Sequence, residues 1–401
     1  MSGPDDVAAF RELLTPRGEA LLARVSPYDE ERAMATAAAL RAEGVDPGLA
    51  AAALTQARLR ARAATRLGPA AARLFFTAAG LEQATRATVA ARHAQRYAGV
   101  AAATGTDLLV ADLCCGLGSD LLALAQAGLR VLGVDRDPLT AAVAAANLSA
   151  LGLQERASVR VADVTEVALD GVGAVFVDPA RRDAGGRTLA PHRWSPPFSF
   201  VIGLAGRVPA TGAKLAPGIP HDLLPAGAEA EWVSVGGDVV ETALWCGPLG
   251  TGVRRRATLL PADVTLTGDG SRRAEPGPVG RYLLEPDGAV VRAGLVAELA
   301  DLVGGRLLDP TIAYLTTDQE PRTPFGSAYE VTDVLPFGVK RLRALLRERG
   351  VGRVTVKKRG TAVTPEQLRP ALRLSGDAEA TVVLTRVAGE QSVLLVQPLA
   401  P

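Results

Sequence analysis

The sequence is short of the residues that most often carry covalent or metal chemistry, and each shortage excludes a class of protein. Its 401 residues include three cysteines, Cys114, Cys115 and Cys246, which are too few and too odd in number for a disulfide framework. The three histidines are not paired at the spacing of metal ligands, so we expect no metal. Lysine and arginine total 44 and aspartate and glutamate 43, which leaves a net charge of +1. A chain this neutral attracts nucleic acid or an anionic surface only through a local patch.

Segments that direct a chain to a membrane are also missing. The N-terminal residues have no basic segment followed by an apolar stretch, so no signal peptide is expected. No uncharged apolar run reaches the roughly 18 residues that a membrane span needs. We therefore expect a soluble, cytoplasmic protein without a membrane partner, and the length suits about two or three domains.

Residues 1–100 have the pattern of a helical domain, with few β-branched residues. Asp46, which precedes a proline, predicts the start of a helix over 47–68. Ser26 also precedes a proline and predicts another helix start. A third helix is expected over 81–97.

Residues 101–265 alternate short apolar runs with helical stretches. Buried strands are expected at 108–113, 131–134, 159–162 and 174–177, with helices at 119–126 and 138–152. This βαβαβ spacing predicts an α/β domain with a Rossmann-like, doubly wound parallel sheet. Further strands are expected at 212–215, 231–235, 239–245 and 255–260. Gly236-Gly237 predicts a hairpin that would place an antiparallel strand at one edge of the sheet.

The stretch 265–280 is rich in glycine, proline and arginine, which is typical of a linker. Residues 280–401 then predict a second, α+β domain. A helix is expected over 339–349, and Thr364 with Gln367 predicts a capping box that opens another helix. Strands are expected at 329–335, 354–357, 381–387 and 393–397.

The strongest chemical signal is the turn after the first strand of the α/β domain, Asp112-Leu113-Cys114-Cys115-Gly116-Leu117-Gly118. Such a turn lets a ligand approach the backbone at the carboxyl end of a parallel sheet. A dinucleotide would need Gly-x-Gly-x-x-Gly, but the third glycine position holds Leu121 in one frame and Ser119 in the other. Asp120, in the first helical turn, would repel a pyrophosphate and tolerate positive charge. S-adenosylmethionine has no phosphate and carries a sulfonium and an amino group, so it fits this pattern.

Polar residues also follow the next three strands. Asp135 lies 17 positions after Gly118 and can accept hydrogen bonds from both ribose hydroxyls. Asp163 can accept from an adenine amino group, and the backbone N–H of Val164 can serve a ring nitrogen. Asp178 ends the fourth strand in a polar loop.

The ordered motifs Asp112-x-Cys-Cys-Gly-x-Gly, Asp135, Asp163 and Asp178-Pro179 resemble those of class I S-adenosylmethionine-dependent methyltransferases over residues 105–265. The resemblance implies that S-adenosylmethionine is the cofactor. It implies a cofactor site built from Asp112, Cys114, Gly116, Gly118, Asp135, Asp163 and Val164. In that site Cys114 replaces a glycine beside the methionine moiety, and Cys115 is buried under the turn.

The loop after the fourth strand is the expected acceptor site. In amino-methylating nucleic-acid enzymes it reads Asp/Asn-Pro-Pro-aromatic. Here Asp178 and Pro179 match, Ala180 replaces the second proline, and Arg181 stands where the aromatic residue would be. The resemblance implies that Asp178 positions the acceptor nitrogen or takes its proton. Arg181 or Arg182 would hold the substrate by stacking or by a phosphate contact, and the alternative is an internal salt bridge.

Five further side chains have two interpretations each. Trp194, Phe198 and Phe200 either stack on the substrate or pack in the core. Cys246 would be a nucleophile for carbon-5 methylation of a pyrimidine only with a general-base side chain nearby. No such side chain is adjacent in the sequence. His93 either faces the cofactor or is an ordinary packed or surface histidine.

The C-terminal domain resembles the THUMP-like domain that bacterial proteins join to this methyltransferase core. The likeness lies in Tyr329-Glu330-Val331 to Leu335-Pro336-Phe337, in Leu342–Leu345 and in Val356–Gly360. THUMP domains belong to enzymes that modify tRNA and rRNA. The resemblance therefore implies RNA methylation and an RNA partner.

A local cluster of positive charge accompanies this resemblance. Nine basic residues and one acid lie from Lys340 to Arg359, and the nine include three of the four lysines in the chain. GC-rich codon usage favours arginine over lysine, so this concentration of lysine is informative. The alternative is a solvated helix face and an edge strand blunted by charge. The candidate RNA contacts are Lys340, Arg343, Lys357, Lys358 and Arg359.

The favoured function is an S-adenosylmethionine-dependent methyltransferase that acts on a base in tRNA or rRNA. Two alternatives stay open. One is methyl transfer to a small molecule or a protein, with the C-terminal domain serving oligomerisation. The other is a non-catalytic RNA-binding protein with a degenerate cofactor pocket.

Overall fold

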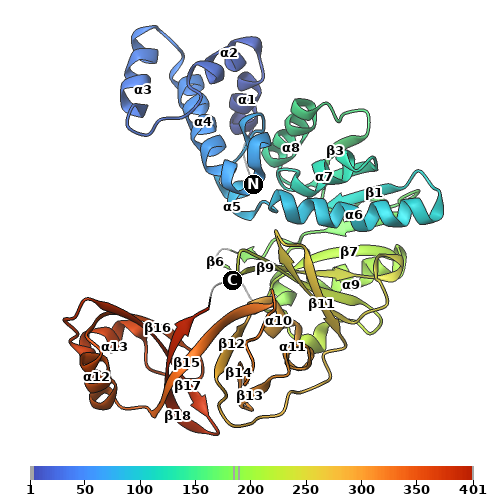
Figure 1. The fold of residues 1–401 in the computed structure, drawn as a ribbon. Coiled ribbons are helices and arrows are strands. Elements are labelled where there is room, and N and C mark those ends of the chain that lie inside the picture. Colours follow the sequence, from blue (N-terminus) through green and yellow to red (C-terminus); the bar gives the residue numbers. More distant parts are fainter. Residues whose placement is uncertain (1–3, 184–185, 188–189, 400–401) are drawn as a thin grey trace. The chain divides into compact units, whose positions relative to one another are not determined.

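The computed structural model describes residues 4–183, 186–187 and 190–399, and the chain divides into two compact units (Figure 1). The first unit comprises Met1–Ala228 and Ala243–Thr251, and the second comprises Glu229–Thr242 and Gly252–Pro401. Strand β9 (Asp238–Trp245) passes from the second unit into the first.

The first helices of the first unit pack around one long helix. That helix is α4 (Pro47–Leu67), and it contacts α1 (Pro4–Leu13), α2 (Pro16–Arg24) and α3 (Ala33–Ala42). The side chain of Asp46 accepts the backbone N–H of Leu49 at 2.9 Å, which confirms the predicted helix start. Leu13, Leu40 and Leu49 are almost fully buried, so the helices share one hydrophobic core.

The helix predicted after Ser26 starts later than expected, at Ala33 of α3. Before it, a side-chain oxygen of Asp29 accepts the backbone N–H of Glu31 at 3.0 Å. Aspartate makes such local turns as readily as helix caps. The sequence pattern was therefore misread as a helix start.

The single helix predicted over 81–97 is two helices in the structure. They are α5 (Ala78–Gln83) and α6 (Ala87–Thr104). Between them Thr85 turns inward, and its hydroxyl donates to a side-chain oxygen of buried Asp120 at 2.6 Å. This tertiary contact, which a helical period does not reveal, breaks the helix next to the functional edge of the sheet.

A parallel sheet with the order β7-β4-β1-β2-β3 forms the core of the first unit, which confirms the predicted fold. Its strands are β1 (Leu109–Leu113), β2 (Arg130–Asp135), β3 (Ala157–Val161), β4 (Ala174–Val177) and β7 (Ala210–Leu215), connected in part by α7 (Ser119–Gln126) and α8 (Pro138–Leu151). The apolar run of β4 is buried along its whole length. Because neighbouring strands run parallel, the residues that follow them meet at one edge of the sheet.

Short elements complete the first unit. They are η1 (Gly68–Ala72), β5 (Arg182–Asp183), β6 (Gly186–Arg187), η2 (Pro191–Arg193), α9 (Phe198–Arg207), η3 (His221–Leu223) and η4 (Gly247–Leu249). Helix α9 contacts β7, and η4 contacts both β7 and α6. On the side of β7 away from β4, the neighbouring strand in the sheet is β9.

The second unit starts before the linker that was expected at 265–280. Its first strands are β8 (Glu229–Val235), the beginning of β9, β10 (Arg255–Leu260) and β11 (Val264–Gly268). Strands β8 and β10 both contact helix α10 (Gly288–Ala293) of the same unit. Strands expected at the end of the α/β domain therefore group with the C-terminal half, because a helix beyond the predicted linker packs on them.

The predicted hairpin at Gly236-Gly237 is present and joins β8 to β9. The two glycines have φ angles of 62° and 89°, which residues with a side chain rarely adopt. The prediction that this hairpin marks a sheet edge is wrong. Strand β8 also pairs in parallel with β10, and β10 pairs antiparallel with β11.

A second sheet in this unit has the order β13-β14-β12-β15-β18-β17-β16. Its strands are β12 (Tyr282–Pro286), β13 (Arg306–Asp309), β14 (Ile312–Thr317), β15 (Gly326–Pro336), β16 (Val351–Lys358), β17 (Ala378–Val387) and β18 (Glu390–Pro398). Its helices are α11 (Val296–Val303), α12 (Val339–Glu348) and α13 (Pro365–Leu372). The predicted capping box of Thr364 and Gln367 is confirmed at the start of α13. Buried Leu342 and Leu346 of α12 and Leu372 of α13 share one hydrophobic cluster with residues of the sheet.

Gly212 in β7 has no room for a side chain. A Cβ there would collide with the Tyr97 hydroxyl and lie 2.8 Å from Cζ3 of Trp245, and both rings are fully buried. Gly212→Ala should lower the free energy of unfolding by about 1–3 kcal/mol, as overpacking usually does. The control is Gly203→Ala on the exposed side of α9, where no atom lies within 4 Å of the added Cβ. Equal free energies of unfolding for the two variants in chemical denaturation would contradict this account.

Candidate active site

A tight turn after β1 exposes backbone at the edge of the parallel sheet. Cys114, Gly116 and Gly118 have φ angles of 63°, 57° and 88°. The Gly118 N–H donates to the Cys115 carbonyl at 2.9 Å and closes the turn before α7. A Cβ built on Gly116 meets no atom within 4 Å, so the space beside it is open. The turn therefore offers a ligand both room and close approach to the backbone.

Asp112 supplies a buried carboxylate below this turn. The residue is 1% exposed, and within the described part of the chain its Oδ2 has no hydrogen-bond partner. Burial raises the pKa of Asp112 well above its usual value, and the nearby acids Asp120 and Asp178 add to this shift. A buried oxygen without a donor is a place where a ligand's N–H group or positive charge would be favoured.

Asp135 ends β2 and holds the turn in place. Its Oδ2 accepts the Gly116 N–H at 3.0 Å, and its Oδ1 accepts the Asp137 N–H at 2.9 Å. Burial raises the pKa of Asp135, while these two backbone hydrogen bonds oppose the shift. Each carboxylate oxygen has a second lone pair, so this side chain could also accept hydroxyl groups of a ligand.

Asp163 and Val164 follow β3 at the same edge of the sheet. Asp163 is exposed, and its Oδ1 accepts the hydroxyl of Thr165 at 2.7 Å and the backbone N–H of Thr165 at 2.9 Å. These hydrogen bonds lower the pKa of the Asp163 carboxyl. Val164 is buried. The residues named for a cofactor thus surround consecutive strand ends, and their binding roles stay predictions.

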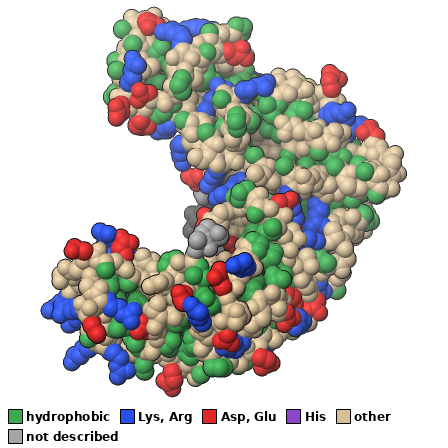
Figure 2. Space-filling view, in the orientation of Figure 1, with side chains coloured by type: hydrophobic (Ala, Val, Ile, Leu, Met, Phe, Trp, Pro, Cys, Tyr) green, Lys and Arg blue, Asp and Glu red, His purple; other side chains and the backbone are tan. Residues whose placement is uncertain are grey.

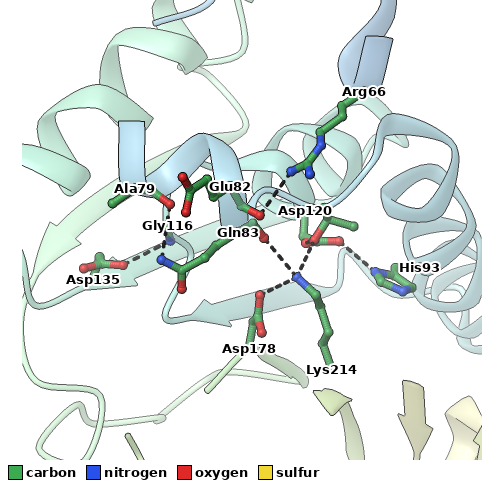
Figure 3. A network of polar contacts seen from close by, with 11 residues as sticks. Arg66, Ala79, Glu82, Gln83, His93, Gly116, Asp120, Asp135, Asp178 and Lys214 are labelled. Carbon is green, nitrogen blue, oxygen red and sulfur yellow. Dashed lines mark hydrogen bonds and ion pairs between the residues drawn. The ribbon is translucent and has the colours of Figure 1, made fainter. Parts of the chain in front are cut away.

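Asp178 lies next to this turn and forms an ion pair that the sequence did not predict (Figure 3). Its backbone N–H donates to the Leu113 carbonyl at 3.1 Å, and its Oδ2 lies 2.6 Å from Nζ of Lys214 in β7. Val177 pairs with Ala213, so Asp178 and Lys214 lie side by side on neighbouring strands. Burial raises the pKa of Asp178, and the Lys214 ammonium opposes that rise.

The ion pair continues into a buried polar network. Lys214 Nζ donates to Thr85 Oγ1 at 3.1 Å, and the Thr85 hydroxyl donates to Asp120 Oδ2. Asp120 Oδ1 lies 2.7 Å from Nδ1 of His93. Burial raises the pKa of Asp120, but His93 and Lys214 outweigh burial and the net shift is downward.

This network corrects one sequence expectation and confirms another. Asp120 was expected to influence the ligand from the first turn of α7, yet its carboxylate bonds Thr85 and His93 in the interior. His93 is 1% exposed, with ring centroids 4.9 Å from Phe176 and 5.6 Å from Trp245. The interpretation of His93 as a packed histidine is thus confirmed.

The loop after Asp178 is tied down by backbone hydrogen bonds. Ala180 and Ser195 exchange two of them, at 2.8 and 3.0 Å. Pro179 is buried, and Arg181 is half-buried, with its charge also lowering the pKa of Asp178. The side chain of Arg182 lies outside the described residues.

The aromatic residues that follow this loop are mostly core residues. Trp194 is 3% and Phe198 is 7% exposed, and their rings meet edge to face at 6.1 Å between centroids. Core packing is therefore the correct interpretation for both. Phe200 is half-buried.

None of the three cysteines has the environment of a reactive thiolate. Cys115 and Cys246 are buried, and burial raises the pKa of both thiols. Burial and the carboxylate of Asp135 also raise the pKa of Cys114. Reactive cysteines need the opposite shift, which nearby positive charge supplies.

Two residues of the site escaped the sequence analysis. Lys214 could have been noticed, because a lone lysine interrupts an apolar strand in a chain with only four lysines. Gln83 could not, because its place depends on the break between α5 and α6. Its carbonyl oxygen accepts from Lys214 Nζ at 3.4 Å, and its side-chain amide donates to the Ala79 carbonyl at 3.2 Å.

The basic cluster of the second unit is smaller than the sequence indicates. Lys357 Nζ lies 2.6 Å from Glu285 Oε2, and an Arg359 nitrogen lies 4.0 Å from the other oxygen of Glu285. Arg343 donates to the Ala371 carbonyl. Two more ion pairs join Arg349 to Asp333 and Arg353 to Glu379. Figure 2 shows red side chains mixed with blue ones over this end of the unit.

Arg347 is exposed but donates to the Arg373 carbonyl at 3.0 Å, and three other cations of this cluster are directed to solvent. They are Lys340 and Arg341 on α12 and Lys358 on β16, and all three are exposed. They are the residues of the cluster best placed to meet phosphate groups. Their RNA-binding role stays a prediction.

Among the residues with described positions, no group of three or more His, Cys, Asp or Glu side chains could hold a metal ion. In the same part of the chain, no helix combines the length and the hydropathy needed to cross a membrane.

Comparison with known sequences identifies relatives of both units. Residues 326–398 match the family described as THUMP domain-like, and residues 6–63 match a domain of unknown function (DUF8688). An uncharacterized S-adenosylmethionine-dependent methyltransferase of Mycobacterium tuberculosis is 37% identical over 340 residues, which cover 82% of this chain and 90% of the relative. The 23S rRNA (uracil(1939)-C(5))-methyltransferase RlmD of Acidithiobacillus ferrooxidans is 36% identical over 81 residues, 19% of this chain and 18% of that enzyme.

A solved structure shares the fold of the whole chain. It is the crystal structure of a protein from Porphyromonas gingivalis W83 that is assigned as a methyltransferase. The two superimpose with a TM-score of 0.74 and 21% identity, and the match covers 100% of both chains. The arrangement of elements described above is therefore not peculiar to this sequence.

Proposed function

Because the chain belongs to the family of S-adenosylmethionine-dependent methyltransferases, we propose that it methylates a nitrogen atom of a base in tRNA or rRNA. The observation that carries the proposal is the partly buried carboxylate of Asp178, which follows the strand beside the glycine turn. Lys214 holds one of its oxygens at 2.6 Å. The other oxygen is then available to accept an N–H group of the acceptor base.

The residues around the turn fit this cofactor. Asp112 would bind its amino group through the buried oxygen that otherwise lacks a donor. Asp135 would accept the ribose hydroxyls, and Asp163 and Val164 would contact the adenine. The open space beside Gly116 would let the ligand rest against the turn formed by Cys114, Gly116 and Gly118. When bound, S-adenosylmethionine supplies an electrophilic methyl group whose bonding electrons remain on sulfur.

Asp178 would act mainly by orienting the acceptor. Its free oxygen accepts one N–H group and so aims the nitrogen lone pair, which forms the new bond to the methyl carbon. The nitrogen then loses one proton, which passes to the Asp178 carboxylate and from there to water. Pro179 would shape the loop, and Arg181 and Arg182 would hold the base or a phosphate group.

A nitrogen acceptor is favoured over carbon-5 of a pyrimidine, the atom in the name of the RlmD relative. Methylation at that carbon requires a nucleophile such as a cysteine thiolate. The pKa values of Cys114, Cys115 and Cys246 are all raised, first of all by burial. Thiols that stay protonated are poor nucleophiles.

RNA is favoured over other acceptors by two similarities. The second unit contains a THUMP-like segment at residues 326–398, and one relative is named for the methylation of 23S rRNA. A degenerate cofactor pocket is disfavoured because Asp112, Asp135 and the open glycine turn are all in place. Methylation of a small molecule or a protein is the second candidate.

The proposal can be tested by methyl transfer in vitro. Labelled methyl from S-adenosylmethionine is offered with total RNA from a strain that lacks the gene, and the digested nucleosides are analysed. We expect label in one modified base whose methyl group is on nitrogen. Label in protein or metabolites alone would contradict the RNA assignment, and label on carbon-5 of a pyrimidine would contradict the nitrogen assignment.

The exposed cations of the second unit give a separate prediction for RNA binding. Replacing Lys340, Arg341 and Lys358 by alanine together should weaken RNA binding and reduce its dependence on salt. Each lost phosphate contact should reduce the slope of log affinity against log salt by about 0.7–0.9. Filter binding over a salt series measures this slope, and S-adenosylhomocysteine binding should not change.

A matched control for this triple variant removes cations that already have acidic partners. Arg349→Ala with Arg353→Ala should change the slope much less, because these side chains pair with Asp333 and Glu379. Equal slopes for the wild type and the triple variant would remove α12 and β16 from the RNA-binding surface.

A further inference from the structure

We propose that Lys214 is a positioning residue, which fixes one oxygen of Asp178 so that the other carboxylate oxygen accepts the N–H group of the methyl acceptor. This inference rests on the proposed function, because it assumes a nitrogen acceptor. The pairing of Lys214 with Asp178 can nevertheless be measured without any acceptor.

The contacts of Lys214 are those of a protonated, immobile ammonium group. Its Nζ lies 2.6 Å from Asp178 Oδ2, 3.1 Å from Thr85 Oγ1 and 3.4 Å from the Gln83 carbonyl oxygen. An ammonium group has three N–H donors and no acceptor, so it can donate to each of these oxygens. The side chain is only 7% exposed, which leaves water little access to it.

Thr85 adds direction to this arrangement. Its hydroxyl proton is directed to Asp120 Oδ2 at 2.6 Å, so only its lone pairs can face Lys214. The other oxygen of Asp120 is held by His93 at 2.7 Å. The Thr85 hydroxyl therefore accepts from Lys214. It could donate in that direction only by breaking its buried hydrogen bond to Asp120.

The parallel register of β4 and β7 places Lys214 beside one oxygen of Asp178. Val177 pairs with Ala213, so Asp178 and Lys214 are adjacent as their strands end. The Asp178 side chain is 26% exposed, whereas Lys214 is nearly buried. Figure 3 shows one oxygen of Asp178 directed to Lys214 and the other on the far side. One oxygen is thus committed to lysine, and the other points away from it.

The charges around Asp178 predict what happens when lysine is removed. Besides Lys214, the groups that act on it are Arg181 in its own loop, Asp120 on α7 and Asp112 on β1. Burial raises the pKa of Asp178, and Lys214 is the strongest influence that lowers it. Without lysine, the carboxyl faces two acids with Arg181 as the remaining cation, so its pKa should rise further.

A titration tests the pair directly. In protein labelled with ¹³C at the aspartate carboxyl carbons and saturated with S-adenosylhomocysteine, the Asp178 signal is assigned by its loss in Asp178→Asn. Lys214→Met should raise the pKa of this carboxyl, whereas Lys214→Arg should leave it closer to the wild-type value. Unchanged titration of Asp178 in Lys214→Met would overturn the proposal. If Lys214→Met does not fold, Lys214→Gln provides the same neutral comparison.

Transfer kinetics separate positioning from a merely structural role. With RNA from the strain that lacks the gene, Lys214→Met should reduce kcat about 10- to 100-fold with little change in KM, because phosphate contacts dominate RNA affinity. The acidic limb of its pH–rate profile should move to higher pH, since activity needs the ionised Asp178. In an Asp178→Asn background, Lys214→Met should cause no further loss.

The outcomes distinguish this inference from the proposed function. Equal losses from Lys214→Met in both backgrounds, with an unmoved pH limb, would show a structural role and overturn the inference. Absence of RNA methylation by the wild type would contradict the proposed function instead. The carboxyl titration would then still decide whether Lys214 controls Asp178.

Discussion

Asp178→Asn is expected to reduce methyl transfer by about 10²- to 10⁴-fold, the usual range for a lost acid–base group, with little change in cofactor affinity. The amide has the same shape as the carboxylate but carries no charge and accepts at only one atom. It cannot serve both Lys214 and the acceptor, and it cannot take a proton. Single-turnover transfer of labelled methyl, together with calorimetric titration of S-adenosylhomocysteine, measures the two effects separately.

The same variant should be less stable, because Lys214 loses its anionic partner. A buried charge with a weakened hydrogen bond costs about 1–3 kcal/mol, which thermal unfolding can detect. Asp170→Asn is the control, because Asp170 is exposed and lies before β4 rather than after it. Full activity of Asp178→Asn would show that Asp178 has no role in methyl transfer. It would thereby contradict the proposed function, which rests on this carboxylate.

The second large effect is expected for Asp135→Ala, which should weaken S-adenosylhomocysteine binding by about 10- to 100-fold. Hydrogen bonds to a charged group are worth about 1.5–3 kcal/mol, and each 1.4 kcal/mol is a factor of about ten in affinity. The substitution also leaves the N–H groups of Gly116 and Asp137 without their acceptor. Calorimetric titration measures the change, and unaltered affinity would contradict the cofactor site.

Two controls show whether that loss comes from the ligand or from the turn. Asp135→Asn keeps an acceptor for one of the two backbone N–H groups and should bind better than Asp135→Ala. Asp170→Ala removes an exposed acid from the same unit and should not change affinity. If both Asp135 variants lose affinity equally and also melt at a lower temperature, distortion of the turn is the better explanation.

The parallel core was predictable from the sequence because its signals are local. Runs such as Ala174–Val177 are apolar and short, and helices α7 and α8, the second with an Asp137 cap, separate the first strands. Parallel strands must be joined by such crossovers, so the order of the motifs along the chain also orders them along the sheet edge. Asp112, Asp135, Asp163 and Asp178 were therefore correctly expected at strand ends.

The boundaries and the inner contacts were less predictable because they depend on distant residues. Strands β8 and β10 belong to the second unit through their contact with α10, which lies beyond the expected linker. The helix expected over 81–97 breaks because Thr85 bonds Asp120, a residue 35 positions away. The sequence predicts one basic patch near the C-terminus, but Glu285, which lies 72 positions before Lys357, pairs with that lysine.

The amino-acid sequence by itself determined that this protein has a Rossmann-like core with a glycine turn and four acids in order, because strand and helix periods and turn residues act over short distances. Only the tertiary structure decided how those acids are used inside the protein. It joined Asp120 to His93 and Thr85, and Asp178 to Lys214, through contacts between segments that are far apart in the chain. The reason is physical: the charge and orientation of a buried carboxylate depend on which donors surround it, and those donors come from other strands and helices.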